Sequence, residues 1–530
     1  MQKYIYCLAT LLLISLHQQA QQKVWVPDLG NGYYKNPVIN ADYSDPDVCR
    51  AGNDYYLVAS SFNAAPGLPI LHSKDLVNWQ IIGHAIQRQF PLAHFDKPQH
   101  GNGCWAPSIR YHKNEFYIYY PDPDFGIYMI KATSAAGPWS DPVMVKAGKG
   151  LIDPCPLWDD DGKVYLVHAW AGSRAGIKSI LTLNRMNAAG TQVTDEGVLI
   201  FDGHPLQPTL EGPKLYKRNG YYFIFAPAGG VSTGWQLVLR SKNIYGPYEE
   251  KIVMDQGKTS VNGPHQGAWV ETPAGAHWFM HFQDKGAYGR VVHLQPMKWV
   301  NNWPVIGEDK DGDGKGEPVM TYKKPLMSSA ISAPATSDEF NANTLGLQWQ
   351  WQANPRSTWM IPFPNKGVLR LFSAQLPDSF HNYWDVPNLL LQKFPADSFT
   401  VTTKCSFIPN AKLEGERTGL IIMGSSYASI SLIKDQLVMA VCKDADKGGR
   451  EVQEVLCTVT NSNCWFRVQV KEGAVCHFSY STNGADFIPV PEPFIAMPGR
   501  WVGAKVGIFC TRPSQINDAG FADYDWFRVE

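Results

Sequence analysis

The chain has 530 residues, 44% of them hydrophobic and 18% charged, so it is a globular protein that is too long for a single core. Its formal net charge of -1 argues against a nucleic-acid-binding protein or one held on an anionic membrane surface. The 10 cysteines are scattered without a CxxC pair, which disfavours a metal cluster and a disulfide framework, although one bridge within the C-terminal half stays open.

The N-terminus has the pattern of a secretory signal peptide. Lys3 supplies a positive charge, the apolar run 5–16 follows, and a cleavage position lies after Ala20. The run is too short to span a membrane, and no later stretch is long and apolar enough. We therefore expect residues 1–20 to be removed, and the mature protein to be exported into the periplasm or the medium, without membrane insertion.

Five segments rich in aromatic and β-branched residues repeat along the next 300 residues, and each is typical of a strand. Counted between Tyr55, Phe116, Val164, Tyr221 and His277, the intervals are 61, 48, 57 and 56 residues. Periods of this size indicate a repeat architecture. Five sheets arranged around one axis predict a five-bladed β-propeller over residues 24–325.

Each repeat carries one distinctive side chain 10 to 12 residues ahead of its reference position: Asp45, Trp105, Asp153, Glu211 and His265. Equal offsets in a radial repeat are equivalent places in space. If that offset is the innermost strand, the five side chains converge on the axis. Three carboxylic acids in one pocket cost free energy and therefore indicate a functional site. The alternative is that Asp-Pro and Glu-Gly-Pro are only turn sequences.

The sequence changes character after the repeats. Residues 326–337 have linker composition, and residues 338–530 show many short alternating strands, which predict a jelly-roll-like β-sandwich domain whose two ends lie close together. The loop with Asp309, Asp311 and Asp313 resembles the start of a calcium loop, but position twelve is Met320. A solvated acidic turn is therefore the preferred interpretation of this loop.

Taken together, the motifs of the repeat region resemble glycoside hydrolase family 43. They are 36–48 (NPVINADYSDPDV), 66–79 (PGLPILHSKDLVNW), 105–107 (WAP), 152–154 (IDP), 211–213 (EGP), 263–267 (GPHQG) and 289–307. The C-terminal half looks like the β-sandwich of the xylosidase/arabinofuranosidase branch.

The resemblance implies roles for the three acids. Asp45 would be the general base that activates water, Glu211 the general acid, and Asp153 the residue that orients Glu211 and raises its pKa. Such a division suits inverting hydrolysis, in which two carboxyl groups face each other across the sugar with room for water. Asp47 is the rival to Asp45, because residues two apart on a strand point the same way.

The resemblance also implies substrate-binding residues. Arg290 would reach the sugar, and Trp105 and Phe62 would form walls of the pocket. His265 would face the axis, where two alternatives stay open: a ligand of a structural calcium ion or of water, and a satisfied core histidine. No cofactor is expected to be required.

The function that follows from the resemblance is an exo-acting, inverting glycosidase that releases terminal pentose from hemicellulose, such as xylan or xyloglucan, or from its oligosaccharides. An α-L-arabinofuranosidase is the first candidate and a β-D-xylosidase with the same site is the second. An endo-acting arabinanase or xylanase would need an open groove instead. A catalytically dead carbohydrate-binding protein is the alternative from another class.

Overall fold

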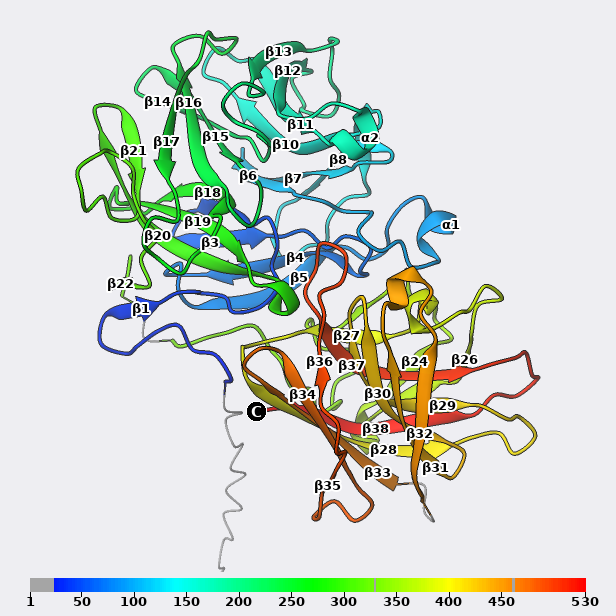
Figure 1. Cartoon of the computed structure of the whole chain (residues 1–530). Coiled ribbons are helices and arrows are strands. Elements are labelled where there is room, and N and C mark those ends of the chain that lie inside the picture. Colours follow the sequence, from blue (N-terminus) through cyan, green and yellow to red (C-terminus); the bar gives the residue numbers. More distant parts are fainter. Residues whose placement is uncertain (1–22, 328–329, 460–462) are drawn as a thin grey trace, which may run out of the picture.

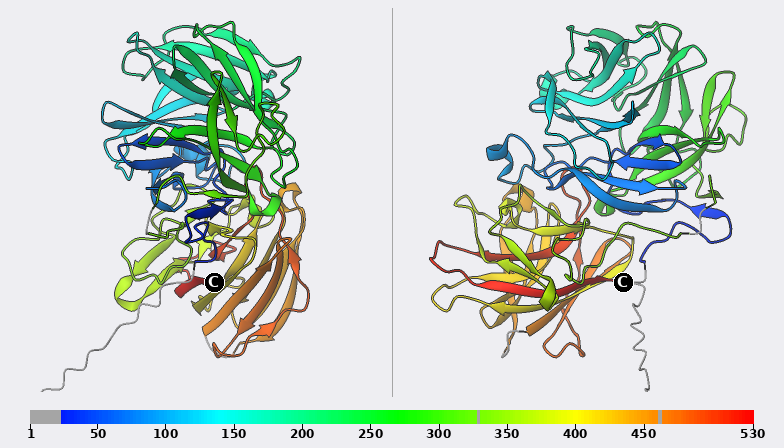
Figure 2. Two further views of the ribbon diagram at one scale, coloured as in Figure 1. Left: turned by 90° about the vertical axis from the view of Figure 1, so that its left-hand side faces the viewer. Right: turned by 180° about the vertical axis from the view of Figure 1, so that it is seen from behind.

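A computed structural model describes residues 23–327, 330–459 and 463–530, which form two all-β bodies (Figures 1 and 2). The N-terminal body has five four-stranded sheets, and the C-terminal body has two eight-stranded sheets. The predicted five-bladed propeller followed by a β-sandwich is confirmed. The predicted signal peptide lies outside the described residues, as do positions 328–329 of the predicted linker. No helix in the described part is long and apolar enough to cross a membrane.

Each propeller blade is an antiparallel meander of four consecutive strands, numbered I to V along the chain. Blade I has β2 (Asp47–Ala51), β3 (Asp54–Val58), β4 (Gly67–Ser73) and β5 (Trp79–Ile86). Blade II has β6 (Ser108–His112), β7 (Glu115–Asp122), β8 (Gly126–Ala132) and β9 (Val143–Ala147). Blade III has β10 (Leu151–Trp158), β11 (Val164–Trp170), β12 (Ile180–Met186) and β13 (Val198–Asp202). Blade IV has β14 (Lys214–Arg218), β15 (Tyr221–Ala228), β16 (Trp235–Ser241) and β17 (Glu249–Met254). Blade V has β18 (His265–Glu271), β19 (His277–Asp284), β20 (Arg290–Val300) and β21 (Trp303–Ile306).

The five repeated segments are the second strands of the blades, β3, β7, β11, β15 and β19. The first strands of successive blades contact one another (β18 with β2, β2 with β6, β6 with β10, and β10 with β14), and β18 also contacts β15 of blade IV. The first strands are therefore the innermost ones. Apolar side chains fill the five spaces between neighbouring blades, one cluster for each pair. The ring therefore closes by packing of blade faces, and no blade borrows a strand from its neighbour.

The sandwich buries its core between two sheets. One sheet has the order β23 (Gln350–Trp351), β27 (Leu390–Lys393), β37 (Lys505–Arg512), β29 (Arg417–Met423), β30 (Tyr427–Ile433), β31 (Gln436–Cys442) and β32 (Glu451–Thr458), with β26 (Ala374–Gln375) beside β37. The other has β24 (Met360–Phe363), β25 (Val368–Phe372), β38 (Phe521–Val529), β28 (Phe399–Ile408), β33 (Asn463–Lys471), β34 (Val475–Ser481) and β35 (Ile488–Pro489), with β36 (Phe494–Ile495) beside β34.

Burial along β28 alternates residue by residue, as expected for a strand with one face in a core. Asp338 and Phe527 exchange backbone hydrogen bonds, so the two ends of the domain meet as predicted. The nine cysteines of the described chain are all free, and the disulfide left open from the sequence is not formed.

Helices are few and short. They are α1 (Leu92–Phe95), α2 (Gly172–Ala175), and the 3-10 turns η1 (Gly286–Tyr288), η2 (Pro364–Lys366), η3 (Tyr383–Asp385) and η4 (Ala445–Lys447).

The propeller and the sandwich are joined by specific polar contacts as well as by the connecting chain. Trp351 and Ala65 exchange two backbone hydrogen bonds across the junction. Asn354 Nδ2 donates to the backbone oxygen of Gln89, and Asn354 Oδ1 accepts from the backbone nitrogen of Gln89. The side-chain amide thus forms the same two hydrogen bonds with the propeller that the backbone of a neighbouring strand would form. The segment between β36 and β37, coloured orange-red in Figure 1, projects from the sandwich toward the propeller.

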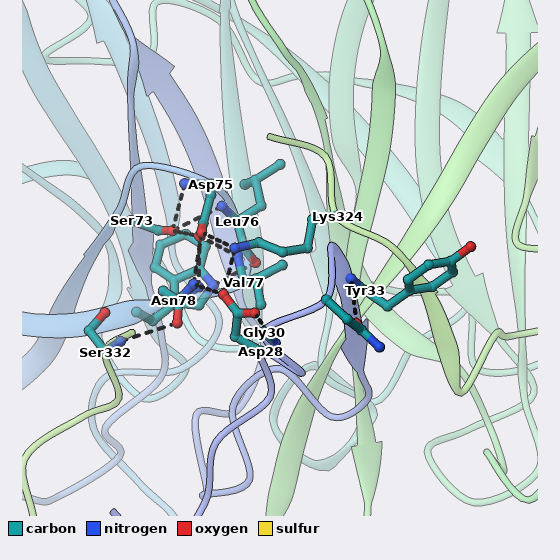
Figure 3. A network of polar contacts seen from close by, with 12 residues as sticks. Asp28, Gly30, Tyr33, Ser73, Asp75, Leu76, Val77, Asn78, Lys324 and Ser332 are labelled. Carbon is teal, nitrogen blue, oxygen red and sulfur yellow. Dashed lines mark hydrogen bonds and ion pairs between the residues drawn. The ribbon is translucent and has the colours of Figure 1, made fainter. Parts of the chain in front are cut away.

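A buried polar network fixes the chain segments that enter and leave the propeller (Figure 3). β1 (Tyr33–Lys35) pairs with β22 (Thr321–Lys323), which brings the two segments side by side. Next to this pair, the Lys324 ammonium lies 2.5 Å from an Asp28 oxygen and 3.1 Å from an Asp75 oxygen. Asn78 donates to both carboxylates and accepts from the backbone nitrogen of Ser332. The Lys324 side chain is only 2% exposed, so the two aspartates depend on it for charge compensation.

The pH dependence of this network follows from Asp28. Burial raises the pKa of Asp28, but hydrogen bonds from Lys324 and Asn78 outweigh that effect, and the net shift is downward. Because the folded pKa lies below the unfolded one, the contribution to stability is complete above the unfolded pKa of about 3.9. It is lost as the pH falls through the folded pKa.

Lys324→Met keeps the apolar length of the side chain but leaves Asp28 and Asp75 facing each other without their shared cation. We expect the free energy of unfolding of the propeller to fall by about 3–5 kcal/mol, which urea denaturation at neutral pH would measure. Lys323→Met is the matched control, because Lys323 is exposed. Equal urea midpoints for the two variants would show that the network adds nothing to stability.

Candidate active site

The three acids predicted from the repeat spacing all lie where an innermost strand begins. Asp45 precedes β2 by two residues, Asp153 is the third residue of β10, and Glu211 precedes β14 by three residues. Asp45 and Asp153 have φ angles of +54° and +55°, in the left-handed region. Asp tolerates this region better than most residues, and strained backbone of this kind concentrates at functional sites.

β-Bulges accompany these turns. The register between β10 and β11 shifts between Ile152 and Cys155, on either side of Asp153. In blade V the register between β18 and β19 shifts between His265 and Gly267. A bulge changes the direction of a side chain at a sheet edge. At both places the bulge releases one side chain, Asp153 or His265, from the regular up-and-down alternation of its strand.

The Asp45 carboxylate is buried and fully engaged. Its Oδ2 accepts hydrogen bonds from Ser44 Oγ at 2.8 Å and from Ser60 Oγ at 2.6 Å. Arg290 Nη1 lies 3.2 Å from Oδ1. Two hydroxyl donors and a guanidinium hold this carboxylate in one orientation, as a group that must face a bound water requires.

Asp47 is held in a different environment. Its Oδ2 accepts from the backbone nitrogen of Ile109 at 2.7 Å and from Arg110 Nη1 at 2.6 Å, and the residue is fully buried. The expectation that Asp45 and Asp47 point the same way was wrong, because Asp45 lies outside β2 in a left-handed turn. Asp47 ties blade I to blade II, which leaves Asp45 as the better candidate for the base.

Asp153 and Glu211 form a pair. Asp153 Oδ2 accepts from the backbone nitrogen of Gly212, the residue after Glu211, at 2.7 Å. Burial and the neighbouring Glu211 carboxylate raise the pKa of Asp153 to about 7, with a smaller contribution in the same direction from Asp45. Asp153 therefore interacts electrostatically with both of the other acids, so the three belong to one site.

Glu211 is the most accessible of the three acids. Its side chain is 28% exposed, whereas that of Asp45 is 7% exposed. Glu211 Oε1 lies 2.9 Å from His265 Nε2, and this histidine is buried. His265 was predicted to face the axis, and it contacts the candidate acid there.

Two aromatic residues predicted as pocket walls lie next to each other. The rings of Phe62 and Trp105 are 6.4 Å apart in an edge-to-face arrangement. Trp105 Nε1 donates to the backbone oxygen of Gly101, and the Arg174 guanidinium lies 5.3 Å from the Trp105 ring. These contacts fix the orientation of the Trp105 ring.

The sandwich contributes a residue that the sequence analysis missed. Trp501, in the loop between β36 and β37, has its ring 6.3 Å from that of Trp105. The Arg290 guanidinium is 5.8 Å from the Trp501 ring and 4.8 Å from that of Phe282. Trp501 is 47% exposed and has a φ of +66°, which is unusual for so large an apolar side chain. No motif in the sequence marks it.

The sequence left calcium open at two places, His265 and the loop with Asp309, Asp311 and Asp313. Within residues 23–327, 330–459 and 463–530, the one group of three acidic, His or Cys ligands close enough to share an ion is Asp309, Asp311 and Asp313. Lys315 lies 3.8 Å from Asp313, and Asp309 accepts from the backbone nitrogens of Gly312 and Gly314. These contacts fit the solvated acidic turn preferred from the sequence, and calcium at either place stays a prediction.

Both domains of the chain match known protein families. A model described as glycosyl hydrolases family 43 matches residues 34–304, and one described as the beta-xylosidase C-terminal concanavalin A-like domain matches residues 337–530. A putative beta-xylosidase of Xylanibacter ruminicola is 42% identical over 91% of this chain and 87% of its own length. A beta-xylosidase of Formosa agariphila is 32% identical over 97% and 92%. The non-reducing end alpha-L-arabinofuranosidase BoGH43B of Bacteroides ovatus is 29% identical over 98% of both chains.

Solved structures share this fold over 94% of the chain. The GH43 protein BlXynB of Bacillus licheniformis superposes with a TM-score of 0.81 at 27% identity, over 94% of this chain and 99% of its own. The Bacteroides ovatus protein described as Xyloglucan PUL GH43B gives a TM-score of 0.78 at 25% identity, over 94% and 99%.

The raised pKa of Asp153 predicts an effect on stability. A buried acid whose folded pKa lies above the unfolded value destabilises the protein as the pH rises from about 4 to about 7. We therefore expect Asp153→Asn to raise the melting temperature, and to raise it more at pH 8 than at pH 5. Asp160→Asn is the control, because the Asp160 side chain is 87% exposed. A melting temperature shift that is the same at both pH values would contradict the assignment.

Proposed function

We propose that this chain, which belongs to glycosyl hydrolase family 43, is an exo-acting, inverting β-D-xylosidase that releases xylose from the non-reducing ends of hemicellulose-derived oligosaccharides. That the chain is a family 43 glycosidase follows from its two matching domains. The sequence alone favoured arabinofuranose. The relatives at 42% and 32% identity are called beta-xylosidases, and this supports placing xylose first.

The observation that carries the proposal is the convergence of three carboxyl groups at the starts of the innermost strands of blades I, III and IV. A water held by Asp45 would lose its proton to this carboxylate as it attacks the anomeric carbon. Ser44, Ser60 and Arg290 would keep Asp45 oriented while it accepts the proton. Attack by water on the face opposite the leaving group inverts the anomeric configuration.

Glu211 is suited to the role of general acid because of its exposure. A leaving alcohol departs toward solvent, and Glu211 has the accessible carboxyl group of the three. Asp153 holds the backbone next to Glu211 through Gly212. Since two adjacent carboxyl groups in a buried site cannot both ionise easily, the pair would retain a proton near neutral pH for transfer to the leaving oxygen.

Exo action is supported by the position of Trp501. This side chain comes from the sandwich and packs beside Trp105 and Arg290, so the sandwich contributes a wall to the site. An endo-acting enzyme needs a groove that is open at both ends for a polymer. A wall on one side suits a pocket that accepts a chain end.

An α-L-arabinofuranosidase is the second candidate. BoGH43B covers the same two domains at 29% identity, and its name gives this activity. Export to the periplasm or the medium is part of the proposal and rests on the N-terminal sequence pattern. The substrate would be an oligosaccharide, and no step of the mechanism requires a metal ion.

We expect the purified protein to hydrolyse nitrophenyl β-D-xyloside faster than nitrophenyl α-L-arabinofuranoside. The first product seen by proton NMR should be α-xylose, because inversion follows from attack by water. A faster rate on the arabinofuranoside would reverse the order of the two candidates. Binding of sugars without hydrolysis of either glycoside would indicate a carbohydrate-binding protein, and initial β-xylose would show that Asp45 acts as a nucleophile.

The acid and the base should respond differently to the leaving group. Glu211→Gln should lower kcat on xylobiose by about 10²–10⁴-fold, and by much less on dinitrophenyl xyloside, whose leaving group needs no proton. Asp45→Asn should be equally severe on both substrates, because water activation is required in each case. Rescue of Asp45→Asn, but not of Glu211→Gln, by the better leaving group would mean that the two roles are reversed.

A further inference from the structure

One buried carboxylate connects the sandwich to the catalytic base. Asp42 lies three residues before Asp45 and is 3% exposed. Its Oδ1 accepts a hydrogen bond from the backbone nitrogen of Arg290 at 2.9 Å. Its Oδ2 accepts one from the backbone nitrogen of Gly503 at 3.0 Å. The two oxygens thus join blade V of the propeller to the loop between β36 and β37 of the sandwich.

The two residues that donate to Asp42, Arg290 and Gly503, are both next to the candidate active site. Arg290 donates to Asp45 and to Ser44, and its backbone oxygen accepts from the nitrogen of Tyr43 at 3.1 Å. Gly503 is two residues after Trp501, whose ring lies beside the Arg290 guanidinium. Asp42 therefore holds the backbone of Arg290, whose side chain contacts Asp45, and also the backbone of the loop that carries Trp501.

The junction is packed at backbone contact. A Cβ atom on Gly289 would lie 2.5 Å from Asp42 Cβ, and one on Gly503 would lie 2.6 Å from the backbone nitrogen of Gly289. The sandwich contacts the hairpin between β19 and β20 at a further point, because the backbone nitrogen of Ala504 donates to the backbone oxygen of Ala287 at 2.7 Å. The backbone next to Arg290 and the backbone of the Trp501 loop are therefore packed directly against each other.

A carboxylate is the group that this place requires. Two backbone N–H groups point at its two oxygens, so an amide of the same shape could accept from one and would oppose the other with its own N–H. A negative charge also suits this place, because two lysines of the sandwich lie opposite each other in neighbouring strands, Lys393 in β27 and Lys505 in β37. Burial and the neighbouring Lys393 lower the pKa of Lys505 to about 8, and Asp42 partly offsets this effect.

We propose that Asp42 is a positioning residue through which docking of the sandwich sets the placement of Arg290 and Trp501 and thereby the activity of Asp45. The inference rests on the proposed hydrolytic function. The sandwich would then contribute to catalysis in two ways, by supplying the Trp501 wall and by positioning Arg290 through Asp42. Asp42 itself touches neither the sugar nor the attacking water in this scheme.

Asp42→Asn in the full chain should lower kcat by about 10–100-fold, because a small displacement of Arg290 disturbs the geometry of the base. The loss of kcat should be the same on xylobiose and on dinitrophenyl xyloside, because the substitution does not alter Glu211, the proposed general acid. Hydrogen–deuterium exchange should become faster in peptides that contain the amides of Arg290 and Gly503. This readout does not depend on turnover, so it decides the linkage even if the wild-type protein hydrolyses neither glycoside.

Asp397→Asn is the matched control. Asp397 of the sandwich pairs at 2.7 Å with Lys285, which lies in the β19–β20 hairpin just before Arg290. This pair is at the same domain junction, but among the described polar contacts none joins the Asp397 side chain to Arg290 or to the Trp501 loop. This variant should keep the wild-type kcat. Gly503→Ala, which forces the loop away from Gly289, should reproduce the kinetic loss if Asp42→Asn does not fold. Wild-type kcat in folded Asp42→Asn, or equal losses of kcat in Asp42→Asn and Asp397→Asn, would overturn the proposal.

Discussion

The site depends on a local departure from strand geometry at the propeller axis. A regular strand alternates its side chains between the two faces of a blade, and neither face looks along the axis. Left-handed turns at Asp45 and Asp153, and the bulges in β10 and β18, occur where the innermost strands begin. Each such residue costs on the order of 1–3 kcal/mol, which the surrounding structure must offset. The five apolar clusters between blades are buried, and close packing of this kind makes a core rigid enough to hold such conformations.

That rigidity requires a closed ring, and closure here relies on segments outside the blades. The N-terminal segment packs into the cluster between blades I and V, and Ile39 pairs with Val292 of β20. The polar network around Lys324 then holds the entering and leaving chains together beside β1 and β22. Asp42 and Asp45 belong to the same entering chain. The segment that closes the ring is therefore also the one that places Asp45 at the axis and contacts the sandwich through Asp42.

The sequence predicted what is periodic and could not predict what arises from contacts between distant segments. The repeated strands and the three acids were found because a radial repeat converts equal spacing into equal position. The direction of Asp47 was missed, because a left-handed residue at Asp45 breaks the alternation that the argument assumed. Trp501 was missed because its partner Trp105 lies some 400 residues earlier, on a separate domain, and no short motif records such a contact. Asp42 was quoted within a motif, but its two backbone partners come from blade V and from the sandwich.

Charge pairing around the axis distinguishes the acids more sharply than spacing does. Asp45 has Arg290 from blade V, and Asp47 has Arg110 from blade II. Asp153 has the buried Lys214 of blade IV, whose charge acts to lower the pKa of Asp153 against the larger effects of burial and Glu211. Within the described residues, the only ion-pair partner of Glu211 is His265, which is charged only when protonated. Asp45 and Asp47 thus each form an ion pair with an arginine from another blade, and within the described residues Glu211 forms none with an arginine or a lysine. An acid without a fixed counter-charge can carry a proton more readily than one beside a permanent cation, and this is the difference that the proposed role of Glu211 as general acid requires.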